Sequence, residues 1–531
     1  MVYSKISALN GNQKSGGNSS SLLRSKRFAS VMGIILVTII VAAVIGATWQ
    51  NVPSSSSQSE GEQLYQQAVA LENQGNFTQA MELYFQALPL LQAQNSSLTQ
   101  QCREGAERIA FFQFTYPYNE EQVTAYLSEF FPDVPAQQIS AWVSSGEIEH
   151  YTWDGIKHYY VDAPANIRFS SLALLQANAT VEKAYHDLFL EFDASPSKSS
   201  EPYQKPVTYS ATQTLNVPRD QLPATGLLQI WFPLPINNGP QSVVIESITP
   251  YTYVKQPPSV NQDIGLLYME VPLEQLQGNL SVQIKYSFTH YEQRFTIDPA
   301  NVGTYDTNSE LYQQYTRSYG NTEITPEIHN LALQIVGEET NPYLAAHKLY
   351  NYVVNNITYA YMPHMVMWPR TNQTESTYVH EYKRGDCGAQ SLYFSTMCRS
   401  LGIPARTTGG WQLFSGQFGT HFWAEFYLPN YGWVPVDTSA AQLGFYPVNI
   451  TDQQRQVFIN YFFANQDSMR CVVQKDIDLQ LIPAAKGMVM LPMAIQEPAV
   501  LCATITDNIP CAVINQYWSV NCTSTTPQAT P

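Results

Sequence analysis

Three residues whose types suit nucleophilic catalysis, Cys387, His421 and Asp437, lie in that order in the second half of the chain. Apolar residues recur with a helical period after Cys387 until Gly402, which predicts a helix capped at its start by Asp386. Cys387 therefore lies in the first turn of that helix. A helix N-terminus favours a thiolate because of its partial positive charge. Its unpaired backbone N–H groups can also receive an oxyanion.

His421 and Asp437 lie on two predicted strands that are joined by a short turn. The side chains of 421–437 alternate as in a β-hairpin, with a Pro-Asn-Tyr-Gly turn in the middle. If Leu428 pairs with Gly432, His421 and Asp437 lie diagonally on the same face of the hairpin. The carboxylate would then orient one imidazole nitrogen while the other faces the thiol, which is the arrangement of a nucleophile, a base and an orienting acid.

The segments around these residues resemble the transglutaminase-like family of the papain-like thiol enzymes. The matching segments are RGDC at 384–387, CRSLGIPAR at 398–406, THFWAE at 420–425 and GWVPVDTS at 432–439. The resemblance covers about residues 325–440 and implies an α+β fold with the cysteine on a helix and the histidine and aspartate on adjacent strands. It also implies that Cys387 is the nucleophile, His421 the base and Asp437 the orienting acid. Phe422 departs from the small residue that usually follows the histidine in this family.

Other residues near the predicted site have less specific roles. The oxyanion donor stays open between the Cys387 N–H group and the Trp368 indole. Cys398 lies about three turns further along the helix and is expected to be a buried packing thiol. His364 and His380 fall in a predicted exposed loop without metal-ligand spacing, and no EF-hand pattern occurs. We therefore predict neither a metal site nor a cofactor.

The composition limits the class of protein. The chain has 531 residues, of which 44% are hydrophobic and 12% aromatic, so it can bury sizeable cores. Charged residues make up only 13%, and the formal net charge is −16. This acidic balance argues against nucleic acid as a partner, because contact with phosphates requires basic patches.

Residues 28–49 contain an uncharged apolar run that is long enough to cross a bilayer as a helix. The charges before it are all basic, and no acidic residue precedes Glu60. Basic flanks stay in the cytoplasm, so we predict a single-pass cell-membrane protein with its large domain outside. A cleaved signal peptide is the alternative, but the run is longer than a typical signal peptide's apolar region. The N-x-S/T sequons that follow are compatible with an extracellular glycoprotein and lie at Asn76, Asn95, Asn178, Asn279, Asn356, Asn372, Asn449 and Asn521.

The patterns along the chain predict an α+β multidomain protein. Its segments are a cytoplasmic tail (1–27), a transmembrane helix (28–49), a linker (50–61), a tetratricopeptide-like helical segment (62–113), a small α+β segment (114–205), an antiparallel β-sandwich (206–300), the transglutaminase-like catalytic domain (301–445) and a C-terminal β region (446–531). Only one helical repeat unit is visible, which favours a hairpin packed on the next module over a peptide-binding array. Outside the cell, disulfides are expected among Cys471, Cys502, Cys511 and Cys522, with their pairing left open.

These features predict a membrane-anchored extracytoplasmic thiol enzyme that acts on protein or peptide amides. Transfer of the acyl group to water would make it a cysteine peptidase or amidase, and transfer to a lysine amine would make it a cross-linking acyltransferase. The predicted partners are a protein or peptide substrate and the membrane. A surface binding module with an idle triad is the alternative, and thiol reactivity separates the two classes, because an idle cysteine should label no faster than Cys398.

Overall fold

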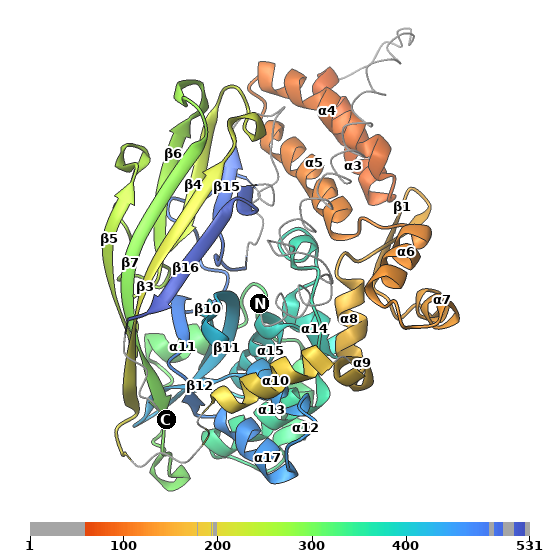
Figure 1. Ribbon diagram of the computed structural model, residues 1–531. Coiled ribbons are helices and arrows are strands. Elements are labelled where there is room, and N and C mark those ends of the chain that lie inside the picture. The colour runs from red at the N-terminus through yellow and green to blue at the C-terminus, as the bar shows by residue number, and fades with distance from the viewer. Residues whose placement is uncertain are drawn as a thin grey trace.

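The computed structural model describes residues 59–177, 179–192, 194, 199–487, 493–502 and 514–525. The predicted tail and transmembrane helix lie outside these residues, and none of the helices within them is long and apolar enough to span a bilayer. The described chain is a mixed α+β protein. Long antiparallel strands form one side, helices from the N-terminal third form another, and a compact α+β core lies below and between them (Figure 1).

The N-terminal third is helical apart from one hairpin. Its elements are α3 (Glu60–Asn73), α4 (Phe77–Ala93), α5 (Leu98–Thr115), α6 (Glu120–Phe130), α7 (Ala136–Ser145), β1 (His150–Trp153), β2 (Ile156–Tyr159), α8 (Ala163–Ser170), α9 (Leu172–Ala177) and α10 (Ala179–Glu191). Asn119 caps α6 through its side chain, as its residue type predicts. Asp154 and Gly155 join β1 to β2 with φ of 49° and 73°, the left-handed values that a type I′ turn requires.

Two antiparallel sheets with one shared core follow. One sheet has the order β13 (Asn465–Gln466), β7 (Leu280–Arg294), β3 (Tyr203–Val217) and β16 (Trp518–Ser524), with β5 (Gln241–Thr249) also paired to β7; the other has the order β15 (Ala499–Cys502), β4 (Leu227–Pro233) and β6 (Leu266–Pro272). Alternate side chains of β3 and β7 meet in this core with nearly continuous buried runs from β4 and β6, and Trp231 and Tyr286 are fully buried. The alternation gives β3 and β7 one apolar face each.

The strands that follow residue 446 are shared among the sheets. Figure 1 shows β15 and β16, drawn in blue, beside the yellow and green strands β4 and β3, which are their hydrogen-bonded partners. β14 (Arg470–Gln474) instead pairs with β10 (Ala405–Gln412) of the α+β core. Cys471 and Cys522 are free thiols, contrary to the expected disulfides, and Cys511 lies outside the described residues.

The α+β core surrounds one buried helix, α15 (Cys387–Ser400), and a sheet of order β12–β11–β10–β14. Its remaining elements are α11 (Glu310–Thr316), α12 (Pro326–Val336), α13 (Pro342–Asn356), β8 (Thr358–Tyr359), the 3-10 turn η5 (His364–Val366), α14 (Glu375–Tyr382), β9 (Arg384–Gly385), β11 (Gly419–Leu428), β12 (Gly432–Val436), α16 (Thr438–Gln442) and α17 (Asp452–Tyr461). Thr325 and Asn341 cap α12 and α13, each followed by proline at the first helical position. The side chains from Gly388 to Arg399 are all buried, so α15 is held from every direction.

Candidate active site

Cys387 is the first residue of α15, as the helical period predicts. The side chain of Asp386 caps the helix by accepting a hydrogen bond from the Ala389 N–H group at 3.1 Å. The backbone N–H of Phe422 interacts with the Cys387 thiol. The Phe422 ring lies so close to Gly388 that a side-chain carbon added there would be 3.1 Å from it. The start of α15 therefore lies directly against β11, next to His421.

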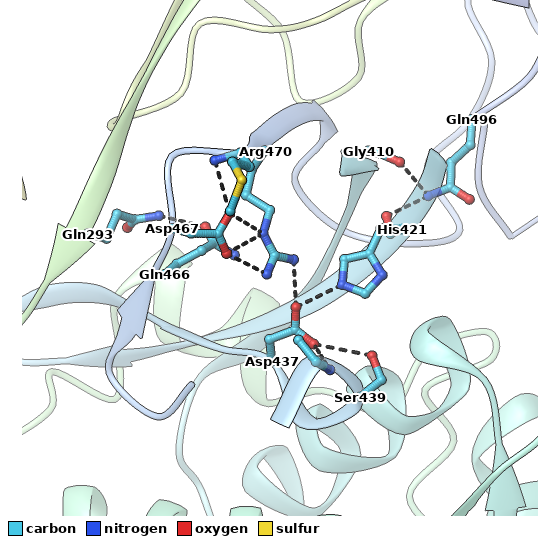
Figure 2. Close-up of polar contacts among 11 residues, drawn as sticks. Gln293, Gly410, His421, Asp437, Ser439, Gln466, Asp467, Arg470 and Gln496 are labelled. Carbon is cyan, nitrogen blue, oxygen red and sulfur yellow. Dashed lines mark hydrogen bonds and ion pairs between the residues drawn. The ribbon is translucent and has the colours of Figure 1, made fainter. Parts of the chain in front are cut away.

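His421 and Asp437 are brought together by the predicted hairpin register. Leu428 pairs with Gly432, and this register places the two residues diagonally on one face. The Nε2–H group of His421 donates to Oδ2 of Asp437 at 2.7 Å (Figure 2). Within the described part of the chain His421 Nδ1 has no hydrogen-bond partner, so this is the nitrogen left for a thiol proton. The other Asp437 oxygen accepts from the Ala440 N–H group at 2.9 Å.

A buried arginine completes the carboxylate's surroundings. Arg470 Nη1 lies 2.6 Å from Asp437 Oδ2, and Nη2 lies 2.8 Å from Asp467 Oδ2, with the guanidinium side chain fully buried (Figure 2). Burial alone would raise the pKa of Asp437, but His421 and Arg470 outweigh it and hold that pKa well below its usual range. Asp437 is therefore an anion in the site. Sequence reasoning missed Arg470, because it lies outside the segments that resemble the family.

Burial sets the charge state of the thiol and the imidazole. It raises the pKa of Cys387, and the neighbouring Asp386 carboxylate adds to the effect. Burial also lowers the pKa of His421, although Asp437 acts in the opposite direction. Both shifts favour a neutral thiol beside a neutral imidazole. The helix N-terminus alone predicts a thiolate, but desolvation of the charged form outweighs it here.

A segment near the C-terminus lies against the thiol. Ile477, Met493 and Ala494 form an apolar cluster with Leu392 and Phe422, and Cys387 packs against it. Gln496 then joins two strands. Its Nε2 group donates to the backbone oxygens of His421 at 2.6 Å and of Gly410 at 2.8 Å. This segment both narrows access to the thiol and fixes the backbone of the candidate base, and no sequence motif marks it.

The two histidines upstream of the cysteine are not in an exposed loop, contrary to the sequence-based prediction. His364 begins η5 and lies between Glu375 and Asp386, at 2.7 Å and 2.6 Å. His380 is on α14, and its Nδ1 lies 2.9 Å from the Tyr393 hydroxyl. The sequence around the two histidines resembles a loop. Their contacts could not be predicted from it, because the partner residues lie on separate elements.

The other predicted residues are placed as follows. Cys398 is fully buried in the main core, which confirms its assignment as a packing thiol. Trp368 is half-buried, and its backbone N–H donates to the Gln373 carbonyl at 2.9 Å; no contact in the described residues joins its indole to Cys387. Within the described ranges, no group of three or more His, Cys, Asp or Glu side chains is arranged so that it could hold a metal ion.

Comparisons with known proteins place the family resemblance on the same residues. Residues 329–438 match the Transglutaminase-like superfamily. This segment contains the cysteine, the histidine and the aspartate, and the match confirms the resemblance read from the sequence.

The curated relatives carry no assigned activity. An uncharacterized protein of Haemophilus influenzae is 25% identical over 180 residues, covering 29% of this chain and 48% of that protein. The uncharacterized protein YebA of Bacillus subtilis is 24% identical over 181 residues, covering 31% of this chain and 24% of YebA. The chain thus spans about half of one relative and about a quarter of the other.

Two solved structures align over larger parts of the chain. A proposed cysteine protease from Cytophaga hutchinsonii aligns with a TM-score of 0.39 and 12% identity, covering 62% of this chain and 94% of that one. The periplasmic domain of TgpA from Pseudomonas aeruginosa aligns with a TM-score of 0.24 and 14% identity, covering 52% and 95%.

Proposed function

We propose that this chain, which carries a transglutaminase-like domain, is a thiol enzyme that acts on amide bonds of proteins or peptides. The observation that carries the proposal is the His421–Asp437 pair, which leaves Nδ1 of the ring without a hydrogen bond in the described residues, while the N–H group of the next residue, Phe422, interacts with the Cys387 thiol. A nucleophile, a base and an orienting anion are the parts that acyl transfer requires.

The neutral resting pair defines the first step. Cys387 Sγ attacks the amide carbonyl carbon while His421 Nδ1 takes the thiol proton. The tetrahedral oxyanion would be received by the Cys387 N–H group, which points out of the first turn of α15. The imidazolium that forms is stabilised by the anionic Asp437 at 2.7 Å. It then gives its proton to the departing amine as the carbon–nitrogen bond breaks, which leaves a thioester.

The second step differs only in its acceptor. If His421 activates water, the thioester is hydrolysed and the enzyme is a peptidase or amidase. If a lysine amine attacks instead, the product is a cross-link. The apolar side chains that pack against Cys387 restrict the approach of bulk water, but they do not choose between the acceptors.

A product analysis tests the proposal. The full chain is incubated with a glutamine-containing protein and a primary-amine probe, and released ammonia, incorporated amine and new peptide termini are measured separately. We expect at least one product from the wild type and none from Cys387→Ala. Cys398→Ser is the matched control, since this thiol is buried in the core and should leave the product yield unchanged. Equal yields from wild type and Cys387→Ala would reject a thiol enzyme.

We further propose that the enzyme is anchored in the cell membrane by residues 28–49 with the large domain outside. The basic flank before the apolar run supports this orientation. Protease added to intact cells should then degrade the domain. Survival of the domain until the cells are lysed would reject the orientation but would leave the proposed thiol chemistry unaffected.

A further inference from the structure

His364 is held between two carboxylates at the start of the α15 helix. Its Nδ1 lies 2.7 Å from Glu375 Oε1, and its Nε2 lies 2.6 Å from Asp386 Oδ2. The side chains of His364, Glu375 and Asp386 are 16%, 1% and 15% exposed, so water screens these contacts weakly. The group is next to the thiol in sequence, because Asp386 immediately precedes Cys387.

The geometry requires a proton in this group. Carboxylates only accept hydrogen bonds, and a neutral imidazole has one N–H donor, whereas a doubly protonated ring has two. Asp386 also accepts from the Ala389 N–H group, which favours its ionised form. Burial would lower the pKa of His364, but the charges of Asp386 and Glu375 outweigh it and raise that pKa well above its usual value. The extra proton therefore belongs on His364.

Arg384, two residues before Asp386, pairs with Glu149. In the described residues, the other groups that influence this cluster or the thiol are acidic. They are Glu375 on α14, Asp386 before α15, Asp437 before α16, Asp478 after β14, Tyr160 before α8 and Tyr359 on β8. Asn321 links two of them, since its Oδ1 accepts from the Glu375 N–H group at 3.2 Å and its Nδ2 donates to Asp478 at 2.8 Å. Burial raises the pKa of Asp478 to about 7. Among these groups His364 supplies the positive charge closest to Asp386.

We propose that His364 is a positioning residue that holds a proton between Glu375 and Asp386, and that this proton offsets the negative charge of Asp386 beside the Cys387 thiol. An uncompensated Asp386 would oppose ionisation of the thiol, because like charges repel most strongly when burial removes water. His364 acts through Asp386 and does not touch the reacting atoms. The inference rests on the proposed function, since it concerns how that nucleophile is prepared.

The test uses two substitutions that preserve shape and change charge. In Glu375→Gln the amide can donate to Nδ1, so the ring keeps one proton on Nε2 and loses its positive charge. The midpoint of Cys387 alkylation by iodoacetamide should then move up by roughly 0.5–1 pH unit. In Asp386→Asn the helix keeps a good N-cap, the charge nearest the thiol is removed, and the midpoint should move down.

Alkylation of Cys387 is followed by peptide mass spectrometry on the full chain over a pH series that extends well above the ordinary thiol pKa of about 8.5, because burial raises the pKa of this thiol. The matched control is Glu149→Gln, because Glu149 also accepts from a side chain of α14, Tyr378, but does not contact His364. This control should leave the midpoint unchanged. Opposite shifts in the two test variants support the inference, and addition of Glu375→Gln to Asp386→Asn should then cause little further shift.

If His364 has a purely structural role, the expected results differ. Both variants would lower the melting temperature, and Glu375→Gln would leave the alkylation midpoint in place or lower it, which overturns the inference. If Glu375→Gln does not fold, His364→Gln decides, because it removes the same positive charge, and an unmoved midpoint in that variant would reject the inference. The proposed function fails separately, when alkylation of Cys387 is indifferent to His421→Ala.

Discussion

The two histidines on either side of the cysteine have opposite electrostatic surroundings. His421 meets one carboxylate, through Nε2, whereas His364 meets a carboxylate at each nitrogen. Burial lowers the pKa of His421, while at His364 the two carboxylates overcome burial and raise the pKa. A base needs a nitrogen without a proton, so only His421 suits that role. The number of charged partners therefore sets the protonation state of a buried histidine, and with it the role that the histidine can take.

Arg470 adds to this difference. It contacts the carboxylate that holds His421, and its positive charge lowers the pKa of the ring. The carboxylates around His364 have no such guanidinium among the contacts described, and the histidine itself supplies the positive charge. Asp437 is thus an anion beside a neutral His421, whereas Glu375 and Asp386 are two anions around a positively charged His364.

The largest expected effect separates the two histidines by activity. His421→Ala removes the base and should lower turnover by roughly 10⁴–10⁶-fold, as loss of a triad base does elsewhere. His364→Gln changes only the charge environment of the nucleophile, so we expect a loss of roughly tenfold or less near pH 7. Single-turnover rates on one substrate measure both. Equal losses would mean that the two histidines do not differ in role.

Arg470→Met should produce the largest loss of stability. It leaves Asp437 and Asp467 buried without their shared cation, which should cost about 3–5 kcal/mol in the free energy of unfolding. Urea denaturation measures this change. The matched control is Arg399→Met, which breaks a buried ion pair with Asp476 away from His421. The control should also destabilise the protein, but only Arg470→Met should alter the titration of His421.

The pH dependence of turnover sharpens the same comparison. A general base works in its neutral form, and the pKa of His421 lies below its ordinary value of 6.5 because the ring is buried. Turnover should therefore be retained as the pH falls to about 6.5 and be lost only below it, as the ring is protonated. Removing the Arg470 charge should shift this acidic limb to higher pH. The pH dependence of kcat/KM measures this acidic limb. If kcat/KM of the wild type already falls well above pH 7, His421 is not the neutral base.

Gln496→Ala is expected to have the smallest effect of these changes. It removes two hydrogen bonds to the backbone oxygens of His421 and Gly410, which should cost about 1–3 kcal/mol of stability. A slight displacement of the base should lower turnover by roughly tenfold. Thermal denaturation and turnover check the two parts. A loss as large as that of His421→Ala would show that Gln496 does more than hold the strand.

The features that could be predicted from the sequence depend on neighbours along the chain. Asp386 caps the helix that begins at Cys387, and Leu428 pairs with Gly432, as the residue types and the alternation indicate. These are local choices that backbone hydrogen bonding and side-chain periodicity determine. The transglutaminase-like resemblance over about residues 325–440 can also be recognised because its motifs are short and contiguous, and the family match over residues 329–438 confirms it.

The distant groups that surround those residues could not be predicted from the sequence. Arg470 and Gln496 reach the site from the C-terminal part of the chain, where β14 joins the catalytic sheet, and nothing in their own segments points to Asp437 or His421. The charge state of Cys387 followed the same rule. The position of Cys387 at a helix N-terminus predicts a thiolate, but burial by Met493 and its neighbours raises the pKa of Cys387 and favours the neutral thiol. Desolvation and ion pairing depend on what packs around a group in space. The candidate reacting residues and their local elements can therefore be read from the sequence, whereas their protonation states follow from the fold.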